Sequence, residues 1–157
     1  MGVDRVTPGT VAVVLDKENN LVLLHLRNDK PMWSLPGGPP DFGESFSSAI
    51  VRETAEETGY KIEIIRLIGV YSKSEYWIFD YPDGNRAHAF AAAFECVVVG
   101  GEARPNMEDS LEVRWFPLGE LPENTMPMHP KVIEDCINGK SGVISVSYTH
   151  LTLPTKA

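Results

Sequence analysis

A group of acidic residues with one arginine could hold a metal cation and activate water for hydrolysis. Glu53, Glu56 and Glu57 stand at positions i, i+3 and i+4, and Arg52 and Glu44 precede them. On a helix with about 3.6 residues per turn, the three glutamates lie on one side, where like charges repel by about 0.2–0.5 kcal/mol per pair. One arginine cannot balance three anions, whereas a hard divalent cation such as Mg²⁺, which prefers oxygen ligands, can. The spacing therefore indicates a metal site, with a solvated acidic helix face as the alternative.

The helix that carries these residues is predicted to span Phe46–Thr58. Ser45 is a favourable N-cap residue, and Gly59 suits the left-handed conformation that commonly ends a helix. The residues expected to form an apolar stripe facing the protein interior are Phe46, Ala49 and Ile50. Those expected to point the other way are Ser47, Ser48, Ala55 and Thr58. The glutamates continue the apolar stripe, and burying unpaired carboxylates is costly. We therefore interpret them as functional.

The remaining elements follow from apolar runs that are separated by turn-forming residues. Residues 10–16 and 21–27 predict a β-hairpin, and residues 32–44 begin as a short strand and continue as a loop rich in Pro and Gly. Further strands are predicted at residues 60–72, 75–81, 86–99 and 112–118, and a second helix at residues 129–140. Strands and helices mix without a regular βαβ alternation, which predicts an α+β fold with a mixed sheet between helices.

Composition and charge limit the classes of protein and of partner. The chain has 157 residues, of which 43% are hydrophobic and 23% charged, as in a single globular domain. A net charge of −8 argues against nucleic acid and anionic membranes as partners. We expect neither a signal peptide nor a membrane-spanning segment. Cys96 and Cys136 form no metal-ligand pattern and are expected to be buried thiols, which favours the reducing cytoplasm.

The last residues are expected to lie outside the folded domain, which we place at residues 1–142. Residues 143–157 form a C-terminal tail. Within it, residues 146–157 resemble the translation of a sequencing-library adapter joined to a truncated reading frame, and such an extension would have no part in the fold. The alternative is a C-terminal edge strand, since Ile144, Val146 and Tyr148 alternate.

The glutamates belong to a longer motif, G-x5-E-x7-R-E-U-x-E-E-x-G-U, in which U is bulky and apolar and which runs from Gly38 to Tyr60. Its charged and glycine positions match by chance with a probability on the order of 10⁻⁹ per starting position. This pattern resembles the Nudix box, and the chain is similar to MutT-like Nudix hydrolases from about residue 10 to residue 139. Two positions depart from the family pattern, because Thr54 replaces an aliphatic residue and Tyr60 is aromatic. We expect a small cost in stability and no loss of chemistry.

The resemblance implies an α/β/α sandwich with a mixed β-sheet and a loop–helix–loop metal site. The cation would be Mg²⁺, with Mn²⁺ as a substitute. Glu56 and Glu57 match the family's main metal ligands, and Glu53 matches a third ligand or a general base. The carbonyl group of Gly38 is implied as a further ligand.

Other acidic residues and the arginine of the motif receive supporting roles from the resemblance. Arg52 is expected to orient a glutamate through a charge-assisted hydrogen bond, with a surface arginine as the alternative. Glu44 would brace the loop and the helix, or would simply be a favourable charge near a helix N-terminus. A metal ligand from a later loop is placed at Glu108, with Asp109 and Glu112 nearby and a solvated loop acid as the alternative.

Substrate recognition is assigned to Arg27, Tyr76 and Phe90. Arg27 ends the second predicted strand and could meet a phosphate, or it could be a surface arginine. Aromatic residues that could stack on a base, with core packing as the alternative, are Tyr71, Tyr76, Trp77, Phe79 and Phe90. A tyrosine near position 76 recurs in family members that cleave diadenosine polyphosphates.

The implied activity is Mg²⁺-dependent hydrolysis of a phosphoanhydride bond in a nucleoside diphosphate linked to a group X. Nucleoside triphosphates, dinucleoside polyphosphates and nucleotide sugars are all substrates of this class. Mg²⁺ would neutralise phosphate oxygens and activate water, and a glutamate would accept the proton. One alternative is a catalytically silent nucleotide-binding or regulatory module, although such modules tend to lose the glutamates that are intact here. Another is hydrolysis of RNA 5′ ends, which the lack of a basic stripe disfavours. A homodimer remains possible.

Overall fold

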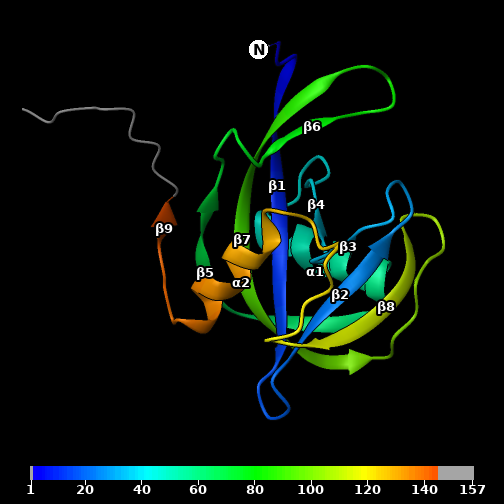
Figure 1. Cartoon of the computed structure of the whole chain (residues 1–157), viewed down its shortest axis with the longest axis vertical. Coiled ribbons are helices and arrows are strands. Elements are labelled where there is room, and N and C mark those ends of the chain that lie inside the picture. The colour runs from blue at the N-terminus through cyan, green and yellow to red at the C-terminus, as the bar shows by residue number, and fades with distance from the viewer. Residues whose placement is uncertain (1, 145–157) are drawn as a thin grey trace, which may run out of the picture.

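The fold is built around one long mixed sheet, which the computed structural model describes within residues 2–144. Strand β1 (Arg5–Asp16) runs parallel to β7 (Arg86–Gly101), and β7 pairs antiparallel with β5 (Tyr60–Tyr71). A short β6 (Ile78–Asp80) pairs with the first residues of β7. Figure 1 shows these long strands side by side through the middle of the molecule.

The predicted hairpin exists, but its two strands diverge soon after the turn. β1 and β2 (Leu21–Arg27) pair only at Leu15↔Val22 and Asp16↔Leu21. Beyond this point, β2 pairs antiparallel with β3 (Trp33–Ser34) and with β8 (Ser110–Pro117). The short β4 (Gly37–Gly38) returns to pair with β1. The divergence separates β2 and β8 from the long sheet, as Figure 1 shows.

Two helices cover opposite faces of the long sheet. Because successive side chains of a strand point to opposite faces, Val11 and Val13 of β1 belong to one apolar cluster, whereas Ala12 and Val14 belong to another. The first cluster includes residues of α2 (His129–Ile137), and the second includes Ile50 of α1 (Phe46–Thr58). The predicted fold class, an α/β/α sandwich with a mixed sheet, is confirmed.

Helix α1 has the predicted ends. Its N-cap, Ser45, accepts a hydrogen bond from the backbone N–H of Ser48 at 3.1 Å. At the other end, Gly59 adopts a φ of 81°, a conformation that glycine reaches without strain, and its N–H donates to the Ala55 carbonyl. The sequence signals therefore fix where the helix starts and stops.

The buried face of α1 differs from the predicted one. Thr58, which we predicted to point outward, is buried, and so is Thr54, whereas Phe46 is exposed. Each threonine hydroxyl donates to the carbonyl four residues earlier, Thr54 to Ile50 at 2.7 Å and Thr58 to Thr54 at 2.6 Å. A threonine that satisfies its hydroxyl within its own helix can be buried at little cost. Ala49 and Ile50 are buried as predicted, whereas the inward position predicted for Phe46 and the outward position predicted for Thr58 were wrong.

Several other element boundaries differ from the prediction. The strand expected at residues 75–81 shrinks to β6, because the backbone N–H groups of Tyr76 and Trp77 both donate to the Lys73 carbonyl in a turn. β1 begins earlier than predicted, because pairing with β7 extends it to Arg5. α2 ends at Ile137 rather than at residue 140.

The C-terminal segment divides at the limit of the described residues. Val143 and Ile144, which we assigned to the tail, form strand β9 (Val143–Ile144) and pair with Gly69 and Val70 of β5. Residues 146–157 lie outside the described residues, so their interpretation as an adapter-derived extension or as an edge strand stays a prediction.

Cys96 and Cys136 are both buried free thiols, as predicted. Among the described residues, neither helix combines the length and the hydropathy needed to cross a membrane. The cytoplasmic location stays a prediction.

Candidate active site

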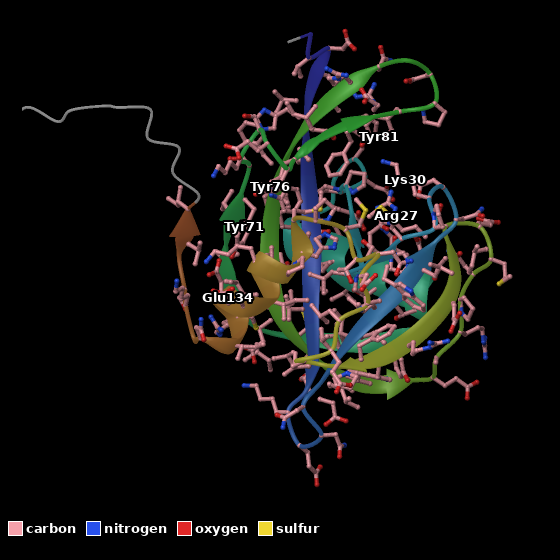
Figure 2. The ribbon with its side chains drawn as sticks, viewed as in Figure 1. Arg27, Lys30, Tyr71, Tyr76, Tyr81 and Glu134 are labelled. Carbon is pink, nitrogen blue, oxygen red and sulfur yellow. The ribbon has the colours of Figure 1, made fainter. Side chains whose placement is uncertain are left out.

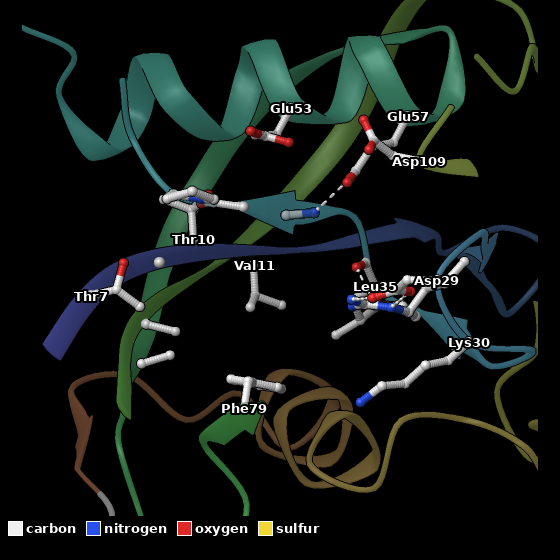
Figure 3. A pocket seen from close by; sticks show the side chains of 18 of the residues that line it. Thr7, Thr10, Val11, Asp29, Lys30, Leu35, Glu53, Glu57, Phe79 and Asp109 are labelled. Atoms are coloured by element: carbon white, nitrogen blue, oxygen red, sulfur yellow. Dashed lines mark hydrogen bonds and ion pairs between the residues drawn. The ribbon is translucent and has the colours of Figure 1, made fainter. Parts of the chain in front are cut away.

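A cavity of about 520 Å³ opens between α1, the first half of β1, the end of β2 and the segment around β6. Figure 3 shows its two walls. Glu53 and Glu57 of α1 form the acidic wall together with Asp109, which comes from the loop before β8. Phe79 and Lys30 lie on the opposite wall. The cavity therefore brings together residues from separate parts of the sequence, with carboxylates gathered on one side.

Glu57 is a buried carboxylate in the wall of this cavity, with 7% of the residue exposed. One of its oxygens accepts a hydrogen bond from the backbone N–H of Gly37 at 2.9 Å. Burial raises the pKa of Glu57 well above its usual range, and the negative charges of Glu53 and Asp109 raise it further. The Gly37 hydrogen bond only partly offsets these effects. Glu57 is thus a strong candidate to face a positive charge that comes from outside the chain.

His25 lies next to Glu57 but does not neutralise it. Its Nε2 is 3.8 Å from Glu57 Oε1, the shortest approach of a basic side chain to this carboxylate among the described residues. Burial, and then the charge of Arg27, lower the pKa of His25 to about 4. The ring is therefore neutral near pH 7, and the Glu57 charge has no cationic partner within the described part of the chain.

Glu53 packs against the loop that precedes α1. A Cβ atom added to Gly38 would lie 2.6 Å from the carboxyl carbon of Glu53, so only glycine permits this approach. The Gly38 carbonyl accepts a hydrogen bond from Thr10 Oγ1 at 2.7 Å. Burial raises the pKa of Glu53, although a hydrogen bond from Arg52 opposes the shift.

Arg52 ties the loop to the acidic residues of α1. Its Nε and Nη2 atoms each donate to Glu44, both at 2.8 Å, in a bidentate pair. Its Nη1 donates to Glu53 at 3.0 Å and to Glu56 at 3.2 Å. The Arg52 guanidinium, together with the backbone N–H of Asp41, lowers the pKa of Glu44 to about 2. Arg52 thus donates charge-assisted hydrogen bonds to three glutamates, while the roles predicted for Arg52 and Glu44 in catalysis stay predictions.

Not all the predicted ligands face the cavity. Glu56 lies outside its lining, and its side chain is 51% exposed beside Arg52. Glu108 and Asp109 both line the cavity, but Asp109 is the acid whose charge raises the pKa values of Glu53 and Glu57. Figure 3 shows Asp109 beside Glu57. The geometry therefore favours Asp109 over Glu108 as the downstream acid.

Two of the three residues predicted to bind substrate lie away from the cavity. Tyr76 sits in the turn before β6, and Figure 2 shows it apart from Arg27 and Lys30. Phe90 lies beside the ring of His88, with 4.6 Å between the ring centroids. Neither aromatic side chain lines the cavity. The turn at Lys73 and the exposed position of Phe90 on β7 account for the difference.

Arg27 does line the cavity, as predicted, but it is not a free cation. It donates to both carboxylate oxygens of Asp29, at 2.8 and 2.7 Å. The Asp29 hydrogen bonds raise the pKa of Arg27, so its charge is permanent. A phosphate that approached Arg27 would have to share it with Asp29.

Trp77 and Phe79, named among the candidates for base stacking, line the cavity together with Tyr81, whereas the prediction missed Tyr81 and the histidines His25 and His129. The three aromatic residues occupy alternate positions in and beside β6, which is the spacing of one strand face. That alternation was a usable signal. The histidines carried none, because their burial depends on contacts with distant segments.

The donor atoms at the acidic wall fit a divalent cation that is shared with a substrate. Among residues 2–144, no three His, Cys, Asp or Glu side chains are grouped closely enough to hold a metal ion by themselves. Glu57 nevertheless supplies oxygen ligands without a cationic partner among these residues, and Glu53 adds a carboxylate whose hydrogen bond from Arg52 does not offset its burial. Gly38 lies beside Glu53. Mg²⁺ is usually bound in this way, by one or two carboxylates, water and substrate phosphates. A closed, all-protein metal site is not what these residues form.

Comparison with known proteins gives a consistent result. A family model of the NUDIX domain matches residues 6–136. A Bacillus subtilis (strain 168) protein, provisionally named as an 8-oxo-dGTP diphosphatase, is 34% identical over 137 residues, which are 87% of this chain and 84% of that protein. The ADP-ribose pyrophosphatase of Methanocaldococcus jannaschii is 34% identical over 132 residues, 82% of this chain and 72% of its own.

A solved structure supports the same assignment. The crystal structure of an ADP-ribose pyrophosphatase from Streptococcus suis 89-1591 matches with a TM-score of 0.66 and 25% identity, covering 85% of this chain and 90% of that chain. These relatives are named as diphosphatases and pyrophosphatases, so the predicted enzyme class, a hydrolase of phosphoanhydrides, is confirmed. With the box from Gly38 to Tyr60 intact and the family model matched across the fold, this chain belongs to the NUDIX family.

Proposed function

We propose that this protein is a Mg²⁺-dependent pyrophosphohydrolase that cleaves a phosphoanhydride bond in a nucleoside diphosphate linked to a group X. One observation carries the proposal. Glu57 is buried in the cavity wall, next to Glu53 and Asp109, and its nearest basic neighbour is a neutral histidine. A buried charge of this kind is costly unless a cation joins it. A divalent cation and the phosphates that it carries would supply the missing partner.

The residues of the acidic wall have separable roles in this reaction. Glu57 and Glu53, with the Gly38 carbonyl, would hold the cation, which when bound neutralises phosphate oxygens and lowers the pKa of water. Glu53 lines the cavity and has a raised pKa, so it is also placed to accept a proton from attacking water. Arg52 fixes the Glu53 carboxylate through its Nη1 hydrogen bond. Glu56 does not line the cavity, so it would bind the cation only if its side chain broke the hydrogen bond from Arg52 and turned toward the cavity.

The opposite wall suits the nucleoside part of a substrate. Trp77, Phe79 and Tyr81 line it, and flat aromatic surfaces favour a nucleobase. Lys30, whose side chain extends toward Phe79 in Figure 3, adds a positive charge. The matched relatives are named for 8-oxo-dGTP and ADP-ribose, and both compounds are nucleoside diphosphates with a further group. The tyrosine near position 76 was the sequence feature that favoured dinucleoside polyphosphates as substrates. Because Tyr76 does not line the cavity, that feature no longer supports them.

Hydrolysis of a nucleotide panel tests the proposal. The panel contains dGTP, 8-oxo-dGTP, ADP-ribose, diadenosine tetraphosphate and a UDP-sugar, each with Mg²⁺, with Mn²⁺ and with EDTA. We expect turnover of at least one nucleoside diphosphate derivative with Mg²⁺, yielding a nucleoside monophosphate, and none with EDTA. Equal rates with EDTA would overturn the metal assignment. Nucleotide binding in a thermal-shift assay without turnover of any compound would identify a catalytically silent module instead.

A further inference from the structure

His129 begins α2 and reaches the cavity from the side opposite α1. Only 5% of the residue is exposed, and the ring lines the cavity near the aromatic residues. Its centroid is 6.2 Å from that of Trp77, with the rings tilted by 54°. His129 therefore meets the region that would receive a nucleobase, away from the box glutamates of α1.

The hydrogen bond to Leu35 fixes which ring nitrogen carries the proton. The backbone N–H of Leu35 donates to His129 Nδ1 at 3.0 Å, so Nδ1 is an acceptor. Burial, and then the charges of Arg27 and His25, lower the pKa of His129 to about 3, so the ring is neutral near pH 7. A neutral imidazole whose Nδ1 accepts must carry its hydrogen on Nε2. The ring thus has one fixed donor.

That donor has no hydrogen-bond partner among residues 2–144. In the part of the chain that the structure describes, the only hydrogen bond of the His129 ring is the one from Leu35. Nε2 is not among the fully buried atoms that lack a partner, and His129 lines the cavity, so this donor is open to the cavity and can pair with water or with a ligand there. The hydrogen bond from the Leu35 backbone and the neighbouring Trp77 ring restrict the orientation of the His129 ring.

We propose that His129 donates a hydrogen bond from Nε2 to an acceptor atom of the substrate's nucleobase and so positions the base between the aromatic side chains. The ligand class rests on the proposed function. The Nε2–H group of His129 can donate a hydrogen bond but cannot accept one. It therefore favours a base that places a carbonyl oxygen or an unprotonated ring nitrogen against it, and it disfavours a base that places an amino group there. His129 is a positioning residue that sets base preference and does not touch the reacting phosphates.

Steady-state kinetics with two substitutions separates this role from a structural one. H129Q keeps a donor near the Nε2 position, whereas H129N can accept from Leu35 but does not reach the cavity. On the best nucleotide of the panel, we expect H129N to raise KM by about 5-fold with little change in kcat, as for loss of one neutral hydrogen bond. We expect H129Q to restore most of the difference. H88N is the matched control, since His88 does not line the cavity, and its KM should equal that of the wild type.

The outcomes separate this inference from the proposed function. An H129N variant that folds and keeps the wild-type KM would overturn the inference while hydrolysis by the wild type still supports the function. Equal losses of kcat in H129N and H129Q would mark a structural role and would also overturn it. If the wild type hydrolyses none of the nucleotides, the proposed function itself fails.

NMR of ¹⁵N-labelled histidine gives a readout that is independent of turnover. For the free protein we expect the His129 Nε2–H tautomer, and we expect its signal to shift when GMP or AMP is added. Ribose 5-phosphate, which lacks a base, should leave the signal in place. An Nδ1–H tautomer, no shift with either nucleotide, or an equal shift with ribose 5-phosphate would each overturn the proposal.

Discussion

Two regions of the molecule bury carboxylates in different ways. Around α2 and the long sheet, Glu95 and Asp135 are buried, with 4% and 1% exposed, and each has cations within the chain. At the cavity wall, Glu57 is buried to a similar degree, but its nearest basic neighbour is the neutral His25. We therefore interpret the paired carboxylates as structural and the unpaired Glu57 as functional.

The α2 region is a closed network of charges. Lys17 Nζ lies 2.9 Å from Glu95, and Arg66 Nε lies 2.8 Å from it. Although burial alone would raise the pKa of Glu95, hydrogen bonds from these two cations lower it overall. Arg66 also donates to the Cys136 carbonyl at 2.8 Å and so joins the sheet to α2.

Asp135 repeats this arrangement on α2 itself. It accepts a hydrogen bond from the Tyr71 hydroxyl at 2.7 Å, and Lys131 and Lys140 lie 3.2 and 3.7 Å away. Burial opposes ionisation here too, but Tyr71 and Lys131 lower the pKa of Asp135 overall. The two structural carboxylates are thus paired with lysine and arginine side chains of the chain itself, whereas Glu57 at the cavity has only a neutral histidine beside it.

The largest effect is expected from Glu57→Gln, which removes charge from the uncompensated site. We predict a loss of turnover of at least about 100-fold, as is typical when support of a bound metal is lost, with no loss of stability in EDTA. Rates on the best substrate and melting temperatures in EDTA measure the two quantities. Glu95→Gln is the matched buried control and should retain most activity at a temperature where it is folded. If E57Q kept wild-type turnover with Mg²⁺, the assignment of Glu57 would be wrong.

Glu95→Gln should show the opposite pattern. It breaks the hydrogen bonds of one buried carboxylate to Lys17 and Arg66, and we predict a destabilisation of about 1–3 kcal/mol. Urea unfolding followed by circular dichroism measures the free energy of unfolding. Stability equal to that of the wild type would show that this network does not hold α2 on the sheet.

The pH dependence of stability probes a second uncompensated group of the cavity, His129. Its pKa is about 6.5 when unfolded and about 3 in the fold, so the unfolded chain binds a proton first as pH falls. The contribution of the neutral ring is full above about pH 6.5 and decreases below it, by up to about 1.4 kcal/mol per pH unit. H129Q lacks this group, so its unfolding free energy should fall less steeply than that of the wild type between about pH 6.5 and pH 5. Parallel curves would contradict the buried neutral state.

The smallest effect is expected from deletion of residues 146–157. Both kinds of carboxylate site lie among residues 2–144, and we interpret the deleted segment as an extension that is foreign to the domain. We therefore predict a change in unfolding free energy below about 0.5 kcal/mol. Differential scanning calorimetry of the full chain and the truncated chain makes the comparison. A large drop in melting temperature would show instead that these residues belong to the fold.

Local signals predicted much of the site-bearing helix. The ends of α1 at Ser45 and Gly59 agree with expectation, and so does the hydrogen bond from Arg52 to a glutamate, which Glu56 accepts four residues along the helix. Caps and side-chain pairs depend on neighbours in sequence, so they can be read without a fold. The buried face was harder, because Thr54 and Thr58 hide their hydroxyls in hydrogen bonds to their own helix.

The sequence by itself determined the family, the box helix, and the set of acids from which a cation site could be made. Only the tertiary structure decided that Glu53 and Glu57 face the cavity while Glu56 lies outside, and that Asp109 is their acidic neighbour. The same holds for His129, which reaches the cavity from a segment far along the chain. Helical periodicity places side chains on a face, but which face meets a cavity depends on how distant strands and loops pack around it.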